Sequence, residues 1–529
     1  MSYRTRMSGP RARRRAALLP AVLCAALAVA GCSGGQHPAG SGPGTSGGAG
    51  ATGPAVAAGH PLSWQPCPDV GAGLSCASLQ VPLDYTKPSG RKTTLALSEK
   101  PATAPASQRQ GVLLVNPGGP GGPGRAFAGF VADGLSPAVA ADYTIVGFDT
   151  RGVGASVPSL HCDPSFFAGV RPDYVPARHA AEQKLIARAR GYATDCERSY
   201  SSLLPFMTTL NMARDMDSIR AALGQQQISY LGFSYGTYLG QVYATLYPKQ
   251  VRRMVLDSVV NPKGAWYADN IAQDYAFQGR IDAFYAWAAR HDGVFHLGAT
   301  RAQVQAAWTR AYQQLARHPA AGPSGPALGP DEFNDTFVAG GYNDAYWPAL
   351  AAALSSYLRS GSASQLIAQY NAVGKQDENE FAVYNAVECA DAAWPRNWAR
   401  WDSDTRKVAA TAPFEAWDNA WFNAACAFWP VHGPARPTQI KGAGLPGILM
   451  LQGTLDAATP YQGALIARRQ LPTARMVTVP GGGNHGQSLA SPPNQCVNGY
   501  LNRYLAAGAL PSGSGLVSAT CPALPEPAA

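Results

Sequence analysis

The chain has 529 residues, of which 46% are hydrophobic, 9% aromatic and 14% charged. This length and apolar content exclude disorder throughout the chain and allow either one large domain with an insertion or several small domains. The formal net charge of +9 is concentrated at the N-terminus, where six arginines lie within the first fifteen residues, so we expect no nucleic-acid partner.

The N-terminal segment, residues 1–31, has the features of an export signal. Its basic start is followed by the apolar run AALLPAVLCAALAVA, which is too short to span a bilayer comfortably. Residues 29–32, Val-Ala-Gly-Cys, resemble the bacterial lipobox, which predicts a lipoprotein signal peptide and acylation of Cys32. The alternatives are an ordinary secretory signal with Cys32 incidental, and a twin-arginine signal that lacks its usual flanking residues. We expect a protein anchored by lipid to the outer face of the membrane, or secreted.

A stretch rich in Gly, Ser and Pro follows over residues 32–60 and is typical of a flexible tether. Eight cysteines remain after Cys24 and Cys32, an even number that suits disulfides in an oxidising compartment. A zinc site is the competing interpretation, but no C-x-x-C motif occurs, and we expect no metal and no cofactor. Among many possible pairings, the shortest loops join sequence neighbours: Cys67 with Cys76, Cys162 with Cys196, Cys389 with Cys426, and Cys496 with Cys521.

Short apolar runs alternate with longer helical patterns along the rest of the chain, which is typical of an α/β fold with a mostly parallel sheet and crossover helices. The predicted strands span residues 111–116, 143–149, 228–234, 252–260, 447–453 and 475–481. Between residues 260 and 445 the pattern changes to long helical stretches, such as 271–289 and 301–316. We therefore expect a catalytic domain over 61–261 and 445–525, with a helical cap, 262–444, inserted between two late strands.

The segment LGFSYGTYLG places Gly232, Ser234 and Gly236 in a G-x-S-x-G motif between a predicted strand and a predicted helix. In this motif the serine lies on a strained strand-to-helix turn, and small residues on both sides let the backbone turn sharply. The bare pattern recurs by chance in a Gly-rich chain. Its strand, turn and helix context predicts that Ser234 is a catalytic nucleophile.

A nucleophilic serine needs a histidine base and an orienting carboxylate, which follow the G-x-S-x-G motif in the order Ser, Asp, His. Asp456 lies in a loop after the predicted strand 447–453, and His485 lies in the loop GGGNHG after the last predicted strand. These positions predict a triad of Ser234, Asp456 and His485. The alternatives are a helix N-cap for Asp456 and a loop-capping role for His485.

The tetrahedral intermediate of acyl transfer needs backbone N–H donors, and the loop NPGGPGG after the first predicted strand is glycine-dense enough to approach a substrate oxygen. We assign one donor of the oxyanion hole to Gly119 and the other to Tyr235, the residue after the nucleophile. A phosphate-binding loop is the rival interpretation, but no Gly-Lys-Ser/Thr follows. We interpret the loop DTRGVGAS, which contains Asp149 and Arg151, as structural, held by an ion pair beside the site.

The loops NPGGPGG, DTRGVGAS, GFSYGTYLG, QGTLDAATP and GGGNHG, together with the long helical insertion, resemble the proline-iminopeptidase-like branch of the α/β-hydrolases. More specifically, they resemble exported actinobacterial tripeptidyl aminopeptidases and related cell-envelope serine proteases, over about residues 62–525. It implies an α/β-hydrolase fold and the release of short peptides, often tripeptides, from a free N-terminus. A carboxylesterase or lipase with the same triad is an alternative, and a non-enzymatic peptide-binding lipoprotein is another.

An exopeptidase of this kind must bind the substrate's N-terminal ammonium, which needs a paired carboxylate once it leaves water. The segment AVYNAVECADAAWP places Glu388 and Asp391 three residues apart on a predicted helix, beside Cys389, whose disulfide would fix the segment. Acidic residues on a helix are usually just solvated. The resemblance favours a clamp, since iminopeptidase-like enzymes hold the amine with acidic residues of their cap, and we predict that Glu388 and Asp391 bind it.

Overall fold

The structure is a computed structural model that describes residues 62–322 and 325–529; the expected signal peptide, the tether and Cys32 lie outside the described residues. Within the described part, ten strands form one sheet in the order β1-β2-β3-β5-β4-β6-β7-β10-β11-β12. Their bounds are β1 (Gln65–Pro66), β2 (Ser75–Pro82), β3 (Lys92–Lys100), β4 (Gly111–Asn116), β5 (Tyr143–Asp149), β6 (Ile228–Phe233), β7 (Val251–Asp257), β10 (Ile448–Gly453), β11 (Ala474–Val479) and β12 (Ala519–Thr520). A separate hairpin joins β8 (Ala320–Gly322) and β9 (Gly325–Leu328).

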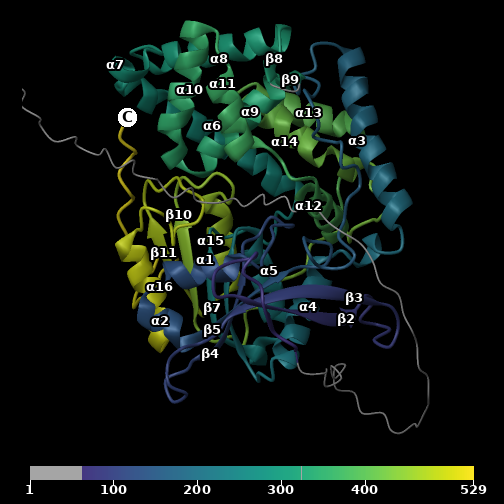
Figure 1. The fold of residues 1–529 in the computed structure, drawn as a ribbon, viewed down its shortest axis with the longest axis vertical. Helices are drawn as coiled ribbons and strands as arrows, with labels where there is room; N and C mark the ends of the chain where they lie inside the picture. The colour runs from purple at the N-terminus through teal and green to yellow at the C-terminus, as the bar shows by residue number, and fades with distance from the viewer. Residues whose placement is uncertain (1–61, 323–324) are drawn as a thin grey trace, which may run out of the picture. The chain divides into compact units, whose positions relative to one another are not determined.

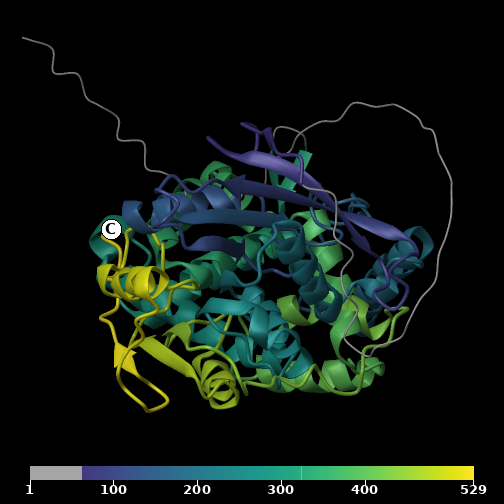
Figure 2. The ribbon, with the colours of Figure 1, turned by 90° about the horizontal axis from the view of Figure 1, so that it is seen from below.

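The sheet is parallel from β5 to β12 and antiparallel at the edge formed by β1, β2 and β3. All six predicted strands are present as β4, β5, β6, β7, β10 and β11, so the expectation of an α/β fold with a mostly parallel sheet is confirmed. The antiparallel strands β2 and β3 were not predicted. Seen from below in Figure 2, the first strands, in purple, and the last, in yellow, lie on opposite sides of the molecule.

Helices cover both faces of the sheet. Their bounds are α1 (Phe127–Gly134), α2 (Pro137–Asp142), α4 (Thr209–Ala222), α5 (Tyr235–Leu246), α15 (Tyr461–Gln470) and α16 (Gln495–Ala507). The helix α3 (His179–Tyr200) packs instead against Trp417, Trp421 and Ala424, which belong to the chain between β7 and β10. Because successive side chains of a strand point to opposite faces, Val112 and Leu114 of β4 pack with α4 and α5, whereas Leu113 and Val115 pack with α1 and α16. The sheet therefore lies between two apolar cores.

The chain between β7 and β10 is mainly helical, and its helices lie together at the top of Figure 1. They are α6 (Tyr267–Arg290), α7 (Asp292–Phe295), α8 (Arg301–Arg317), α9 (Pro330–Tyr342), α10 (Trp347–Ser360), α11 (Ser364–Gln369), α12 (Glu378–Asp391), α13 (Trp398–Ala409) and α14 (Ala416–Asn423), with the short turns η3 (Asp344–Tyr346), η4 (Tyr370–Gly374) and η5 (Ala424–Ala427). Many of them share an apolar core of their own around Trp287 and Trp347. We propose that this region, called the insertion below, is a cap over the site.

Four disulfides are present, as expected, and they join each cysteine of the described chain to its sequence neighbour, the pairing with the shortest loops: Cys67–Cys76, Cys162–Cys196, Cys389–Cys426 and Cys496–Cys521. Such bonds persist in oxidising compartments, which indicates an extracellular location. No helix among residues 62–322 and 325–529 combines the length and the apolar character needed to cross a membrane.

Candidate active site

Ser234 lies on the sharp turn that joins β6 to α5. Its backbone has φ 55° and ψ −128°, a conformation that L residues seldom adopt, and its N–H donates to the Asp257 carbonyl at 3.1 Å. The turn is tight because Gly232 and Gly236 touch: a Cβ on Gly232 would lie 2.5 Å from the Gly236 carbonyl oxygen. The two glycines of the motif are therefore required by space, and they hold Ser234 at the N-terminus of α5.

Asp456 and His485 come together from the loops after β10 and β11. The imidazole Nδ1 lies 3.0 Å and 3.1 Å from the two carboxylate oxygens of Asp456, which also accept from the N–H and hydroxyl of Thr459. The carboxylate is fully buried, and 13% of the histidine side chain is exposed. Although burial opposes a charged ring, the adjacent Asp456 carboxylate raises the pKa of His485 above its ordinary value.

Asp257, the last residue of β7, links the nucleophile turn to the loop of His485. Its carbonyl accepts from Ser234, and its carboxylate accepts from the backbone N–H groups of Gln487 and Ser488, each at 2.8 Å. Burial raises the pKa of Asp257 to about 6. Asp257 was not predicted as part of the site because it lies inside the predicted strand 252–260, whereas in the structure it is the last residue of β7.

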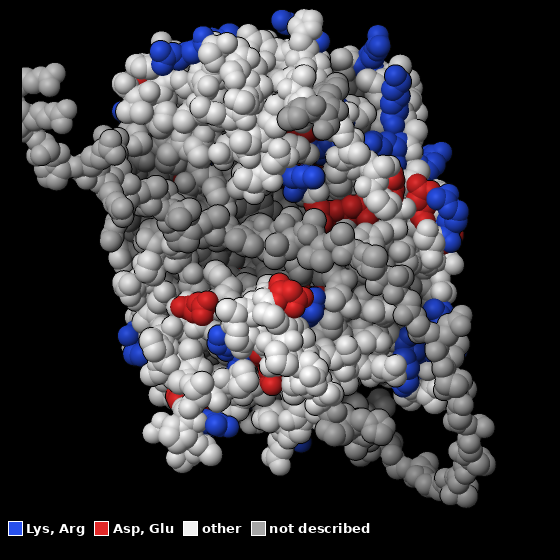
Figure 3. Space-filling view, viewed as in Figure 1, with Lys and Arg blue, Asp and Glu red and all other residues white. Residues whose placement is uncertain are grey.

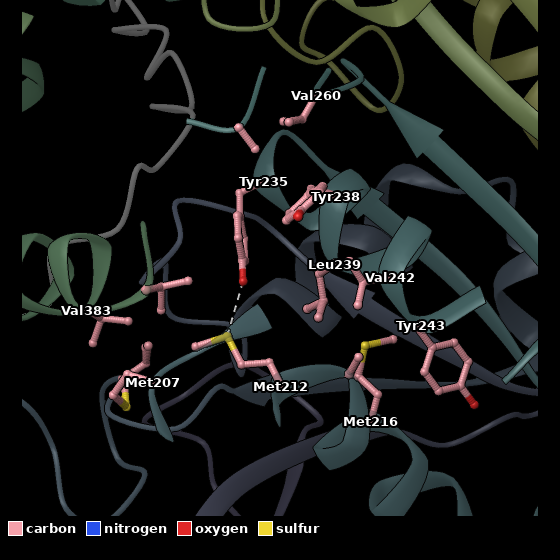
Figure 4. Packing of buried hydrophobic residues seen from close by; sticks show 14 of the residues in the cluster. Met207, Met212, Met216, Tyr235, Tyr238, Leu239, Val242, Tyr243, Val260 and Val383 are labelled. Atoms are coloured by element: carbon pink, nitrogen blue, oxygen red, sulfur yellow. Dashed lines mark hydrogen bonds between the residues drawn. The ribbon is translucent and has the colours of Figure 1, made fainter. Parts of the chain in front are cut away.

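The two residues predicted to form the oxyanion hole, Gly119 and Tyr235, line the same cavity as Ser234. Gly119 has φ 109° and lines the same cavity as Ser234 and Tyr235. A side chain is excluded there because a Cβ on Gly119 would lie 2.7 Å from the next two glycine nitrogens. The ring of Tyr235 points away from the cavity into the core, and Figure 4 shows its hydroxyl directed at the sulfur of Met212, 3.3 Å away. Tyr235 therefore presents its backbone, not its side chain, at the site.

A cavity of about 310 Å³ begins at Ser234 and extends between the sheet and the insertion. Five carboxylates line it, one each from α6, α9 and α12 and two from the region of α14: Asp269, Asp335, Glu388, Glu415 and Asp418. Asp335 is paired with Arg171 at 2.6 Å, and Asp418 accepts from the Asn334 amide. In contrast, one oxygen each of Asp269, Glu388 and Glu415 is buried with no hydrogen-bond partner among the described residues.

Burial is the main cause of the raised pKa values of Asp269, Glu388 and Glu415. It raises the pKa of Asp269 to about 7, and it raises the pKa of Glu388 and Glu415 well above the ordinary value. Neighbouring carboxylates contribute to the last two shifts, Asp391 for Glu388 and Asp418 for Glu415. Burial therefore favours the neutral form of these acids, and a cation entering the cavity would stabilise their charged form.

The structure separates the two residues predicted to bind the amine. Glu388 lines the cavity, but Asp391 does not, and its carboxylate accepts from the backbone N–H of Thr209 at 2.8 Å and from the Thr209 hydroxyl. That hydroxyl also lies 2.6 Å from the Tyr235 hydroxyl. Asp391 is the last residue of α12, where it meets the free N–H groups at the start of α4. We therefore assign Asp391 a packing role and remove it from the amine site.

The loop DTRGVGAS at the end of β5 contains Asp149 and Arg151, and each of them forms an ion pair. The two residues do not pair with each other, because the partner of each lies outside the loop. Asp149 is 3.2 Å from Arg125, and Arg151 is 2.6 Å from Asp215 in a fully buried pair. These contacts fasten the loop to neighbouring segments of the catalytic domain.

Comparison with known proteins gives a consistent assignment. Residues 111–490 match the family described as alpha/beta hydrolase fold. A tripeptidyl aminopeptidase of Streptomyces lividans is 41% identical over 461 residues, which cover 84% of each chain. The serine protease Hip1 of Mycobacterium tuberculosis is 29% identical over 481 residues, 86% of this chain and 90% of the relative. Carboxylesterase B of the same organism is 33% identical over 497 residues, 88% and 92% of the two chains.

The chain belongs to the α/β-hydrolase fold family, as the sheet, the turn at Ser234 and the family match agree. Within it, the chain is a serine hydrolase similar to the tripeptidyl aminopeptidases of actinobacteria. The expected family and the expectation of an enzyme are confirmed.

Proposed function

We propose that the protein is an exported serine aminopeptidase that releases short peptides, with tripeptides the expected product, from the free N-terminus of peptides or proteins. The observation that carries this proposal is the cavity that contains Ser234 together with the buried carboxyls of Glu388 and Glu415, each of which has one oxygen without a hydrogen-bond partner among the described residues. A cavity lined both by Ser234 and by carboxyl groups suits a substrate with one terminal ammonium. The identity to the Streptomyces lividans tripeptidyl aminopeptidase supports the same conclusion.

In the proposed acylation step, Ser234 Oγ attacks the scissile carbonyl carbon and its proton passes to Nε2 of His485. The contact between Nδ1 and Asp456 supports this role, because it fixes the ring and leaves Nε2 for the serine. The backbone N–H groups of Gly119 and Tyr235 stabilise the oxyanion. The imidazolium then donates its proton to the leaving amine, the C–N bond breaks, and an acyl-enzyme remains on Ser234.

In the proposed deacylation step, a water molecule attacks the ester carbonyl of the acyl-enzyme and gives its proton to His485. The proton then returns to Ser234 Oγ as the C–O bond breaks, and the short peptide leaves with a free carboxylate. Overall, one peptide bond and one water are consumed.

We propose that Glu388 binds the substrate's ammonium and that Glu415 is a second candidate on the same cavity. Burial raises the pKa of Glu388 well above its ordinary value. A peptide amine has a pKa of about 8 and is mainly charged at neutral pH, so we expect formation of the ion pair to be accompanied by release of a proton from Glu388. Calorimetry of an inactive Ser234→Ala protein in buffers of different ionisation enthalpy would measure that proton.

Carboxylester hydrolysis is a second candidate function, because the carboxylesterase B relative is 33% identical over 88% of this chain. The same triad cleaves esters, and the cavity walls decide which acyl group is accepted. The carboxyls that line the cavity favour the binding of an amine over the binding of an apolar acyl chain.

We also propose export with a lipid anchor at Cys32, supported by the four disulfides. Peptides are the proposed partners. On the face shown in Figure 3, the Lys and Arg side chains that can be seen lie mainly along the upper and outer margins. Radiolabelled palmitate should be incorporated by the wild type but not by Cys32→Ala, and equal labelling would refute the anchor.

Side-by-side assay of tripeptide anilides and small acyl esters tests the proposed function. The wild type should prefer the anilide with a free amine, and Ser234→Ala should lose about 10⁶-fold in kcat on both substrates. Asp456→Asn should lose about 10⁴-fold because the wrong tautomer of His485 would form. An enzyme that cleaves only the esters would be the carboxylesterase, and a Ser234→Ala protein of normal rate would refute the triad.

A further inference from the structure

The loop that carries His485, residues 481–486 and called the histidine loop here, is fastened to the insertion as well as to the sheet. The backbone N–H of His485 donates to the Tyr342 carbonyl at 2.7 Å, at the end of α9. The N–H of Asp344 donates to Oδ1 of Asn484 at 2.9 Å. The carboxylate of Asp344 also takes part in a hydrogen bond with the Asn484 side chain. Asn484 and Asp344 therefore form a two-point contact directly beside the histidine.

Arg280 of α6 lies beside this contact, next to Asp344 and to the backbone of Gly483. Its side chain is 5% exposed, its Nη2 lies 3.8 Å from the Asp344 carboxylate, and its guanidinium lies over the Trp347 ring at 5.0 Å. A Cβ on Gly483 would overlap Nη1 and Cζ of Arg280, so the guanidinium lies against the backbone of the histidine loop. Glycine at residue 483 is what allows this approach.

The environment of Arg280 is unusual for a merely structural arginine. Its Nε and Nη2 have no hydrogen-bond partner among the described residues, so a buried cation is retained with one long ion pair. The charged groups that act on it are Asp344, Asp456 and Glu526, from η3, the loop after β10 and the C-terminal segment. A buried charge that is incompletely paired costs stability, and an apolar residue of similar volume would fill the same space without that cost. A role beyond packing accounts for its presence.

We propose that Arg280 and Asp344 are positioning residues through which the insertion holds His485 in line with Ser234. Arg280 orients Asp344 and supports Gly483, Asp344 fixes Asn484, and the histidine that follows is thereby placed from the insertion side. The chemical step then depends on the insertion even for substrates that do not reach the acidic end of the cavity. This inference rests on the proposed roles of Ser234 and His485.

The test uses the full-length enzyme and two substrates that report the chemical step: a small acyl ester and a fluorophosphonate probe that labels the activated serine. Arg280→Met should lower kcat on the ester and the rate of labelling together, by about 10- to 100-fold, because small displacements of a catalytic group have effects of this size. KM for the ester should stay within about twofold. Arg280→Lys, which keeps the charge, should recover part of the rate.

Asp344→Asn and the double variant that combines Asp344→Asn with Arg280→Met complete a double-mutant cycle. If the two residues act as one unit, the double variant should lose no more than the worse single variant, whereas independent effects would multiply. Arg468→Met is the matched control, since Arg468 is also a buried arginine but lies on α15 and donates to the Leu471 carbonyl. It should change stability but not the labelling rate. If Arg280→Met does not fold, Asn484→Ala tests the same contact, because it removes the acceptor of the Asp344 N–H.

Unchanged labelling and ester kcat in folded Arg280→Met, or in folded Asn484→Ala, would overturn the inference, as would a change in KM for peptides alone. A wild-type protein that does not react with the fluorophosphonate would instead refute the proposed function. The two failures are therefore distinguishable.

Discussion

Ser234 has a strained backbone conformation, and such strain costs about 1 to 3 kcal/mol unless the surroundings maintain it. Here it is maintained by the hydrogen bond from its N–H to the Asp257 carbonyl and by the contact between Gly232 and Gly236. Asp257 also holds the residues after His485. One buried aspartate thus fixes the turn at Ser234 relative to the residues that directly follow the histidine loop.

Glu388 is the residue on which N-terminal recognition should depend most. We predict that Glu388→Gln raises KM for peptides with a free amine by about 10- to 100-fold, because a hydrogen bond to a charged group contributes about 1.5 to 3 kcal/mol. The rate on a small acyl ester should not change. Steady-state kinetics on both substrates provide the check, and an equal loss on both would show that Glu388 supports the fold rather than the amine.

Asp391 should behave differently, although it lies three residues away. Asp391→Ala leaves the backbone N–H of Thr209 without its acceptor, and a buried unsatisfied donor costs about 1 to 3 kcal/mol. We predict a lower free energy of unfolding in urea and an unchanged KM for peptides. A normal stability with a raised KM would return Asp391 to the amine site.

At the scale of the element, α12 carries both the proposed amine-binding residue, Glu388, and residues that attach the helix to the rest of the fold. Glu388 faces the cavity, Asp391 meets the start of α4, and Cys389 between them is bonded to Cys426 of η5. The sequence places Glu388 and Asp391 on similar sides of a helix, which led to the prediction of a shared site. The outcome differed because Asp391 ends the helix, where the unpaired N–H groups of α4 compete for its carboxylate.

Removal of the disulfide that fixes α12 tests this element. The bond closes a sequence separation of 37 residues, for which chain entropy predicts a loss of about 4 kcal/mol on its removal. We predict that the Cys389→Ser, Cys426→Ser double variant has a lower Tm and a raised KM for peptides, because Glu388 is no longer fixed. The Cys67→Ser, Cys76→Ser variant is the control, which should lower Tm alone. A raised KM in both variants would contradict a specific role for α12.

At the scale of the whole molecule, buried acids make stability depend on pH. Burial raises the pKa of Asp257 to about 6, of Asp269 and Asp391 to about 7, and of Asp274 to about 8. Each binds its proton more tightly in the folded state than in the unfolded state. Their stabilising contribution is therefore complete below about pH 4 and is lost as the pH rises through these values.

We predict a Tm that falls as the pH is raised from about 5 to about 8, measured by differential scanning calorimetry. The raised pKa of His485 acts in the same direction. Asp274→Asn, which keeps an acceptor for the Asn419 amide, should show a smaller fall because one titrating group is gone. A Tm that is constant or rises over this range would show that these acids are not neutral in the folded protein.

The parallel strands and their loops could be predicted because a buried strand is a continuous apolar run and the catalytic types follow such runs directly, as at Ser234, Asp456 and His485. The antiparallel β2 and β3 lack such a run, since β2 alternates between more exposed and more buried side chains and the buried part of β3 includes threonine and serine. Contacts such as Arg280 against Gly483 could not be predicted. They depend on how an insertion settles on a distant loop, which no local pattern encodes.

Digestion of one peptide with a free N-terminus and with an acetylated N-terminus tests N-terminal recognition most directly. Mass spectrometry of the products should show successive tripeptides from the free peptide, and acetylation should slow the first release about as much as Glu388→Gln does. Equal rates on the two peptides, or fragments that begin inside the chain, would contradict an aminopeptidase and favour an endopeptidase or an esterase.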